Sequence, residues 1–464
     1  MNDELRVKNN ELGGKMNYRY RNDEEMKDSG VEWLDVIPKS WTRNKLKREL
    51  KFSVGSTPST SNRSFFEGEN IWVTIGDLNG KYCSESKTKL TEEALRSANM
   101  KKVPKGSLLY SFKLSVGQVA FTETDLYTNE AIASFYPNNN SNLDFWYYAL
   151  GNYLIENSNE NIYGAKLLNQ ELINNANIFV PSEEEQKKIA KFLDKKTAEF
   201  DSIISKKETL IEKLEEAKKS LISEVVTGKV KVVKTNDGYE LVERKKEEMK
   251  DSGVEWLGDI PKEWDIKKVK HVLSEPLKYG ANESAELDDR SLPRYIRITD
   301  FAENGKLKDE TFKSLTIDKA SGYYLNEGDI LFARSGATVG KTFLFKNYKG
   351  KACFAGYLIK ASVNKQIINP EFLYNFTKSK GYENWKNSIF MQATIQNIGA
   401  DKYKELKFTL PNKNEQEIIC EFIEDKNIKY NKFFNKINKQ IEKLKEAKQS
   451  LISEAVTGKI EILD

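Results

Sequence analysis

The chain contains two copies of one pattern, and this duplication limits the folds open to it. "MKDSGVEWLDVIPKSW" begins at Met26 and "MKDSGVEWLGDIPKEW" at Met249, with 13 of 16 positions identical. "LIEKLEEAKKSLISEVVTGK" begins at Leu210 and "QIEKLKEAKQSLISEAVTGK" at Gln440, with 16 of 20 identical. Two halves, from about 26 to 230 and from about 249 to 464, must therefore share one architecture.

The similarity is confined to the edges of each half. Between roughly 50–165 and 275–393 only a skeleton aligns, for example Gly117 with Gly340. Edges that are nearly copied and interiors that differ indicate one shared task and two different specific tasks.

The divergent interiors have the patterns of strands, turns and short helices. "ENIWVTIGDLNGKY" alternates apolar and polar residues and then breaks at Asn79-Gly80, a hairpin-type turn. "KGSLLYSF" and "EGDILFAR" are short β-rich runs, whereas "LDFWYYALGNYL" and "PEFLYNFTKSKGY" are typical of helices. The mixture predicts an α/β (α+β) domain of roughly 150 residues in each half.

Each half ends in a long segment without proline or glycine. In the first copy it runs from Ser182, a predicted N-cap with Glu185 at N3, to the stop at Gly228. A helix of about 46 residues would be roughly 69 Å long. Steps of four and three residues predict a coiled-coil seam. In the first copy the seam is Ile189, Leu193, Lys196, Phe200, Ile203, Lys207, Leu210, Leu214, Ala217 and Leu221. In the second it is Ile419, Ile423, Lys426, Tyr430, Phe433, Ile437, Gln440, Leu444, Ala447 and Leu451.

So polar a helix has too narrow an apolar stripe to be the core of its own domain. Two such helices in one chain most simply pair with each other, and pseudo-twofold symmetry makes the pair antiparallel. The predicted fold is two globular domains joined by an antiparallel coiled coil.

The predicted boundaries follow from the repeat. They are a polar N-terminal tail (1–25), domain 1 (26–181), helix 1 (182–228), a linker (229–248), domain 2 (249–411) and helix 2 (412–458). The tail is either a disordered extension or a segment that resembles the linker at 230–248, which contains "ERKKEEM".

Composition excludes several classes of protein. The net charge is only +4, so any basic surface must be local. The sequence has no apolar run of membrane-spanning length and no apolar signal segment near its start. Its three cysteines lack CxxC spacing, which fits a reducing cytoplasm, and His271 is the single histidine, in a charged stretch. We predict no metal site.

The stretch "ARSGATVGKTF", residues 333–343, resembles a phosphate-binding loop. G-x-x-x-x-G-K-[ST] requires glycine at position 335, which is Ser335; Gly336 comes one residue too late. The first copy has Gly117-Gln118-Val119 at the equivalent place, without lysine or Thr/Ser. We therefore expect a strand followed by a glycine-rich turn rather than a nucleotide site.

No catalytic group of residues is predicted. The "NPEF" stretch at Asn369 lacks the second proline of a methyltransferase motif, and no glycine-rich cofactor loop accompanies it. Asp77 with Glu85 and Lys87 can be fitted to a metal-dependent nuclease pattern, but the second half has no aligned copy.

Polar turns in the divergent interiors suit DNA binding, because hydroxyl, amide and basic groups contact phosphates and base edges. The alternative is that these are ordinary polar loops. In domain 1 the candidate DNA contacts are Ser56, Thr57, Ser59, Arg63, Lys113 and Lys166. In domain 2 they are Tyr279, Asn282, Arg297, Arg334, Lys341, Gln392 and Thr394.

The whole pattern from Met26 onward resembles the specificity (S) subunits of type I restriction-modification enzymes. The resemblance lies in the "SGVEWLDVIPKSW" and "SGVEWLGDIPKEW" leaders, the "VGSTPS" and "YGANES" turns, and the "LISEVVTGK" and "LISEAVTGK" endings. "FVPSEEEQKKIAKFLD" and "LPNKNEQEIICEFIED" open the two helices.

The resemblance implies a function without catalysis in this chain. Each half would be a target recognition domain for one half of a bipartite, asymmetric site in double-stranded DNA. The helices would set the separation, near one DNA turn of roughly 34 Å. The similar edges would dock two modification (M) subunits in the cytoplasm of a prokaryote, with a restriction (R) subunit as a possible further partner. The cofactors S-adenosylmethionine, ATP and Mg are expected on those partners, and none on this chain.

Two other functions remain open at this point. One is a coiled-coil scaffold that binds only proteins, without sequence-specific DNA recognition. The other is a stand-alone nuclease.

Overall fold

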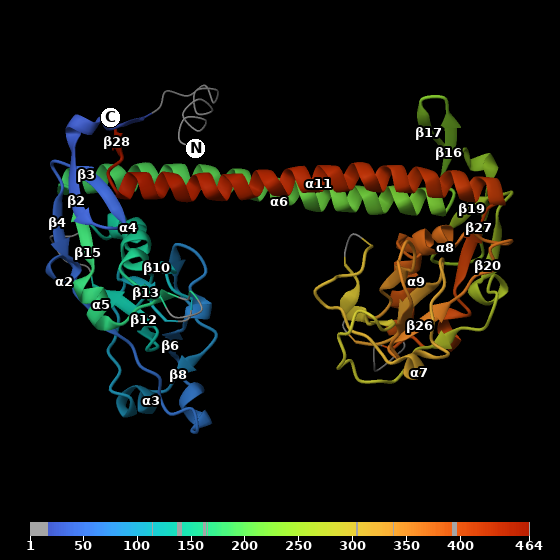
Figure 1. Cartoon of the computed structure of the whole chain (residues 1–464), viewed down its shortest axis with the longest axis horizontal. Coiled ribbons are helices and arrows are strands. Elements are labelled where there is room, and N and C mark those ends of the chain that lie inside the picture. The colour runs from blue at the N-terminus through green and yellow to red at the C-terminus, as the bar shows by residue number, and fades with distance from the viewer. Residues whose placement is uncertain are drawn as a thin grey trace. The chain divides into compact units, whose positions relative to one another are not determined.

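The computed structural model describes residues 17–463 except 114, 137–141, 161–163, 165, 303–304, 337 and 392–396. The chain divides into two units (Figure 1). Unit 1 comprises residues 1–205 and 441–464, and unit 2 comprises residues 206–440. Each unit combines strands, short helices and one half of each long helix, which confirms the predicted mixed class.

Unit 1 is built on a five-stranded sheet with the order β5-β12-β9-β10-β7. Only β10 and β7 are parallel within it; the other neighbours are antiparallel. These strands are β5 (Phe52–Val54), β7 (Tyr82–Cys83), β9 (Leu108–Ser111), β10 (Val119–Thr122) and β12 (Ile132–Phe135). A smaller sheet contains β6 (Asn70–Val73), β8 (Lys89–Leu90) and β11 (Tyr127–Thr128). The short helices are α2 (Leu46–Glu49), α3 (Glu92–Ser97), α4 (Leu143–Glu156) and α5 (Gln170–Asn175).

Unit 2 repeats this topology despite its different sequence. Its four-stranded sheet has the order β21-β26-β23-β24, which matches β5-β12-β9-β10 strand for strand. The strands are β21 (Lys278–Tyr279), β23 (Ile330–Ala333), β24 (Thr342–Leu344) and β26 (Leu358–Ala361), with β22 (Arg294–Ile296) and β25 (Ala352–Phe354) as a second, parallel pair. The helices are α7 (Ile317–Ala320), α8 (Pro370–Phe376), α9 (Lys380–Phe390) and α10 (Ala400–Tyr403).

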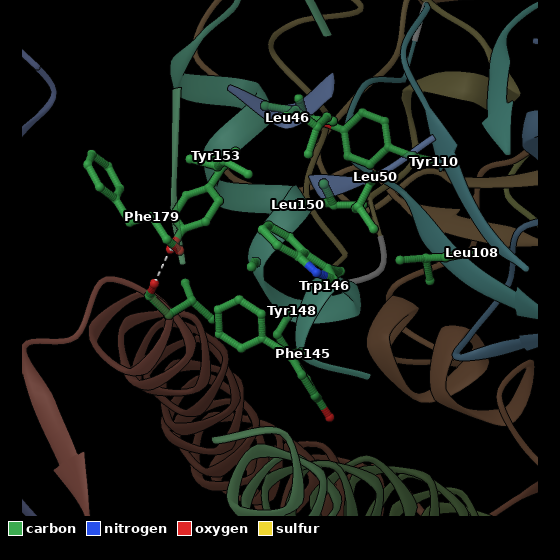
Figure 2. Close-up of a cluster of buried hydrophobic side chains, with 14 of the residues drawn as sticks. Leu46, Leu50, Leu108, Tyr110, Phe145, Trp146, Tyr148, Leu150, Tyr153 and Phe179 are labelled. Atoms are coloured by element: carbon green, nitrogen blue, oxygen red, sulfur yellow. Dashed lines mark hydrogen bonds between the residues drawn. The ribbon is translucent and has the colours of Figure 1, made fainter. Parts of the chain in front are cut away.

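The core of unit 1 lies between its sheet, α4 and the long helices. α4 carries apolar residues on almost every side, as is expected of a helix that is packed on several faces. Its Trp146 and Tyr153 are fully buried, and Figure 2 shows them with Phe179. The Tyr153 hydroxyl donates hydrogen bonds to the carbonyl oxygens of Phe179 and Val456. The last turn of the second long helix is therefore part of the first domain's core.

The long helices are α6 (Glu183–Val226) and α11 (Lys413–Val456), each of 44 residues. Ser182 caps α6 as predicted, since its hydroxyl accepts a hydrogen bond from the Glu185 amide at 3.3 Å. The helices run antiparallel: Lys448 contacts Asp201 at 2.7 Å in unit 1, and Lys207 contacts Gln440 at 2.8 Å in unit 2. In the described part of the chain no helix is apolar enough over sufficient length to cross a membrane.

The predicted seam is partly wrong. Ile203, Leu210 and Phe433 are 44%, 45% and 58% exposed, whereas Ile204 and Ile441 are buried. A straight α-helix drifts about 20° per heptad against a strict seven-residue step, so the buried face moves to neighbouring positions. The predicted seam residues that are buried are Ile189, Leu193, Ile419, Ile423 and Ile437. Those that are half-buried include Phe200, Leu214, Leu221, Tyr430, Leu444 and Leu451.

Part of the N-terminal tail is structured and resembles the linker. β1 (Tyr18–Tyr20) pairs antiparallel with β28 (Ile460–Ile462), with Tyr20 opposite Ile460. In unit 2 the hairpin of β16 (Val230–Thr235) and β17 (Gly238–Glu243) has Val230 opposite Glu243. An offset of 223 residues relates β1 to β17, and an offset of 230 residues relates β16 to β28. Residues 18–20 are therefore the counterpart of the linker's second strand. Of the two alternatives for the tail, the structure favours resemblance to the linker over residues 18–25.

The leaders form matching strand pairs in the two units. In unit 1, β2 (Met26–Val31) pairs with β3 (Leu34–Pro38), and β4 (Thr42–Lys45) with β15 (Asn177–Val180). In unit 2, β18 (Met249–Asp251) pairs with β19 (Asp259–Pro261), and β20 (Asp265–Lys268) with β27 (Lys407–Leu410). One further hairpin, β13 (Asn159–Glu160) with β14 (Lys166–Leu167), belongs to unit 1 alone among the described residues.

A buried arginine, glutamate and tryptophan tie each leader to the start of its long helix. In unit 2, Glu415 accepts from Arg244 at 2.6 Å and from the Trp264 indole N–H at 2.9 Å. In unit 1, Glu185 accepts from Arg21 at 2.6 Å and from Trp41 at 3.0 Å. The duplication of this contact explains why the leaders and helix starts are alike.

We expect Glu415→Ala to lower the free energy of unfolding by about 2–3 kcal/mol. The change leaves the Arg244 guanidinium, with its side chain 3% exposed, with Glu263 as its one remaining carboxylate partner among the described residues, and leaves an indole N–H without its acceptor. The control is Glu421→Ala, because the Lys234–Glu421 pair is 56% and 51% exposed, so water screens it and its loss should change the free energy of unfolding far less. Urea denaturation of both variants measures the difference; equal effects would contradict a special role for Glu415.

Candidate nucleic-acid interface

In unit 2, an arginine and two tyrosines meet at one end of the main sheet. Tyr279 ends β21, Arg334 follows β23, and Tyr357 precedes β26. The Arg334 guanidinium lies 4.9 Å from the centroid of the Tyr279 ring, and the Arg334 amide donates to the Tyr357 carbonyl at 3.0 Å. Tyr279 and Tyr357 are 43% and 65% exposed. We call these three residues the Tyr279 cluster.

The same three strand ends of unit 1 carry different chemistry. Thr57 lies three residues after β5, Lys113 two residues after β9, and Glu130 two residues before β12. The Thr57 hydroxyl donates to the Glu130 carboxylate, and this hydrogen bond, with the charge of Lys113, lowers the pKa of Glu130. We call these residues the Glu130 cluster. Loops at the same three strand ends therefore carry a hydroxyl, an acid and a lysine in one unit, and an arginine with two aromatic rings in the other, although these residues do not correspond one by one in the strand register.

Both sets of side chains can discriminate between bases. A guanidinium donates two hydrogen bonds to guanine, whereas a carboxylate accepts from the amino group of cytosine. Exposed tyrosine rings can make apolar contacts with the methyl group of thymine. The sheet of each unit brings the loops that carry these groups to one edge.

Other predicted contacts in unit 1 are more varied. Ser56 is held by structure, since its hydroxyl donates to Ala98 and its carbonyl accepts from the Trp72 indole at 3.1 Å. Ser59 is exposed on the loop after β5, and Arg63 is exposed at the start of the 3-10 helix Arg63–Phe66 that follows this loop. Lys166, on β14, pairs with Glu160 at 2.6 Å.

In unit 2, the predicted contact Arg297 is paired within its own domain. Its guanidinium contacts the fully buried Asp300 at 3.0 Å and donates to the Thr311 carbonyl, so we assign it a structural role. Asn282 is exposed beside the Tyr279 cluster. Gln392 and Thr394 lie outside the described residues.

The segment 333–343 is a strand, a turn and a strand, as expected. β23 and β24 are antiparallel neighbours, and Gly336 and Gly340 both have φ of +82°. A Cβ on Gly340 would lie 2.5 Å from Cδ of Lys386, so this turn needs glycine there. The turn places Arg334 in the Tyr279 cluster at one end and Lys341 at the other.

The nuclease pattern has a structural explanation. Both carboxylate oxygens of Asp77 are engaged: one accepts from the Thr74 amide at 2.9 Å and the other from the Lys87 amide at 3.3 Å. In unit 2, the Asp300 carboxylate likewise accepts a hydrogen bond from the amide of Arg297. Among the described residues, no three His, Cys, Asp or Glu side chains are grouped so as to hold a metal ion.

Sequence reasoning missed Glu130 and Tyr357. Neither lies in a Ser/Thr-rich or glycine-rich turn, which was the signal used. Aligning the strands of the two copies brings both into view, because Tyr357 lies one residue before β26 and Glu130 lies two residues before β12, and each of these strands pairs with two neighbours.

The two units are thus a duplicated recognition architecture, with unlike groups near corresponding strand ends. A family model described as the type I restriction modification DNA specificity domain matches residues 38–216 and 261–443. The chain belongs to this family.

Relatives and a solved structure are consistent with the assignment. The MjaIX specificity subunit of Methanocaldococcus jannaschii is 25% identical over 331 residues, covering 69% of this chain and 71% of that protein. The MjaVIII specificity subunit of the same organism is 24% identical, covering 64% and 65%. A chain from a structure on complex assembly and conformational transition of the type I R-M system shares the fold, with a TM-score of 0.65, 14% identity, and coverage of 91% of this chain and 99% of that one.

Proposed function

We propose that this chain is the DNA sequence-specificity subunit of a type I restriction-modification complex. Each unit recognises one half of a bipartite, asymmetric site in double-stranded DNA. The observation that carries the proposal is the pairing of one topology with two chemistries: the Glu130 cluster and the Tyr279 cluster occupy the same strand ends. Two reading surfaces of this kind select two unlike half-sites.

The helices and leaders are the docking surfaces for two modification subunits in this proposal. Ile203 and Phe433 are equivalent positions, and both are exposed although apolar. An exposed apolar side chain at the same place in each copy suits two copies of one partner. The partners supply S-adenosylmethionine chemistry, and R subunits, where present, supply ATP- and Mg-dependent cleavage.

The alternative is a scaffold that binds only proteins. It would leave the differences between the two clusters without a purpose, since two identical partners need identical surfaces. A scaffold also has no use for a rigid arginine–tyrosine pair at a strand end.

The deciding experiment expresses the chain with its modification subunits and maps DNA methylation by single-molecule sequencing. We expect methylation at one bipartite motif with two different halves, and none when the modification subunits are expressed alone. Assembly of the complex without any sequence-dependent methylation would support the scaffold and contradict the proposal.

A further inference from the structure

A groove of about 1320 Å³ runs through unit 2 between the recognition domain and the two long helices. One wall is formed by the end of the 334–341 turn, β24, and the beginning of α9. The other wall is formed by α6 and α11. Eight basic and four acidic residues line it, so the groove carries an excess of positive charge.

Three lysines on the domain wall lack acidic partners among the described residues: Lys341, Lys378 and Lys386. The Lys378 ammonium donates to the carbonyl and hydroxyl oxygens of Thr342 at 3.1 and 2.9 Å and lies 4.5 Å from the centroid of the Tyr374 ring. Burial, and then the charge of Lys341, lowers the pKa of Lys378 to about 7. This wall is therefore short of negative charge.

Most of the carboxylates in the groove are already used. Glu383 is paired with Lys219, and Glu371 with Lys346 at 3.0 Å. Glu424 lies 3.8 Å from the same Lys346. These carboxylates therefore do not neutralise the three lysines of the domain wall.

The part of α11 that lines the groove is more positively charged than the equivalent part of α6, and this difference favours an anion. Its lining asparagines are Asn427, Asn431, Asn435 and Asn438. The equivalent residues of α6, 230 positions earlier, are Thr197, Asp201, Ser205 and Glu208. Segment 427–438 has three lysines and no acid, a charge of +3, whereas 197–208 has two lysines and three acids, a charge of −1.

One lost ion pair shows the effect of this change. In unit 1, Asp201 pairs with Lys448 at 2.7 Å. The equivalent residues in unit 2 are Asn431 and Lys218, so Lys218 has no carboxylate in that place. Lys218 lines the groove, where burial lowers the pKa of its ammonium group.

The shared fold does not require these charges. Gly340 lies next to the side chain of Lys386, whereas the equivalent Gly117 lies next to the side chain of Ile155. The residue of unit 1 that is equivalent to Lys341 is Gln118. The basic groove is therefore a property of the second copy rather than of the architecture.

We propose that this groove binds the phosphodiester backbone of duplex DNA next to the half-site recognised by unit 2. Lys341 and Lys386 contact phosphate oxygens, Lys218 adds a further cation, and the asparagine amides donate hydrogen bonds. The same turn places Arg334 in the Tyr279 cluster and Lys341 in the groove. The groups that contact bases and those that contact phosphates are therefore neighbours. The inference rests on the proposed function.

The test replaces two residues of unit 2 by those that the first copy carries, in the variant Asn431→Asp/Lys341→Gln. The new aspartate can pair with Lys218, as Asp201 pairs with Lys448, so the fold should tolerate it. In the complex with modification subunits, we expect affinity for the methylation-mapped duplex to fall about 10- to 100-fold at low salt, with the slope of log affinity against log salt reduced by about 1 to 2. The recognised sequence should not change.

The matched control is Gln366→Glu/Lys267→Gln, which makes the same change in net charge at two positions of unit 2 outside the groove. Thermal unfolding of both variants checks the fold. Equal affinity and salt slope for test and control would overturn the inference. So would loss of modification subunits with unchanged DNA binding by the intact complex, which would indicate an acidic protein segment in the groove. A wild-type complex without sequence-specific binding would instead refute the proposed function.

Discussion

Removing one heptad from each long helix is expected to shorten the spacer of the recognised site by about three base pairs. The segments to remove are 206–212 of α6 and 436–442 of α11, which are equivalent under the 230-residue offset. Seven residues rise about 10.5 Å, and they turn the following residues by only about 20°, so the buried face is nearly preserved. Methylation mapping measures the spacer directly, and both half-site sequences should stay the same.

A three-residue deletion from each helix is the control for this prediction. It shortens the helices less, but it rotates the following residues by about 60° and moves apolar side chains off the seam. We expect it to abolish methylation rather than give an intermediate spacer. An unchanged spacer with full activity after the heptad deletion would show that the helices do not set the separation.

Arg334→Ala is expected to lower the specificity constant for methylation by about 10- to 100-fold and to relax selection at one base pair of one half-site. The reason is that a guanidinium held over Tyr279 discriminates by about 1–3 kcal/mol when it donates to a base. The assay compares kcat/KM for duplexes carrying each single-base substitution.

Two further variants make this measurement specific. Arg290→Ala removes an exposed arginine of the same unit, 64% exposed and paired with Asp309, and should change neither half-site. Lys113→Ala alters the Glu130 cluster and should affect only the other half-site. A uniform loss across both half-sites after Arg334→Ala would mean that the residue supports the fold rather than recognition.

The long-range frame of the molecule could be predicted because its signals are local and repeated. Ser182, Gly228 and the absence of helix breakers between them define α6 to within two residues at each end. The pairing of β1 with β28 joins the two ends of the chain and has no local sequence signal, so the polar tail does not predict β1. The seam shifted at Ile203 because a fixed seven-residue step accumulates error along a straight helix.

The candidate interface was predicted less completely. Tyr279 and Arg334 were both expected, yet nothing in the sequence shows that their side chains meet. Arg297 is paired with Asp300, and the burial of that carboxylate cannot be inferred from a polar turn. Glu130 and Tyr357 become visible only when the sheet brings distant strand ends together.

The division of the chain into units has a consequence for synthesis. Unit 2 is continuous, but unit 1 needs residues 441–464, and Val456 and Ile460 belong to its core together with Trp41 and Ile189. A ribosome that adds about 5–20 residues per second takes on the order of tens of seconds to pass from the end of one segment to the start of the other. During that interval the apolar edge of the first domain is uncovered, while the second domain can complete its own core. The domain that is made first is therefore the last to be finished, and the nascent chain needs protection at its N-terminal half.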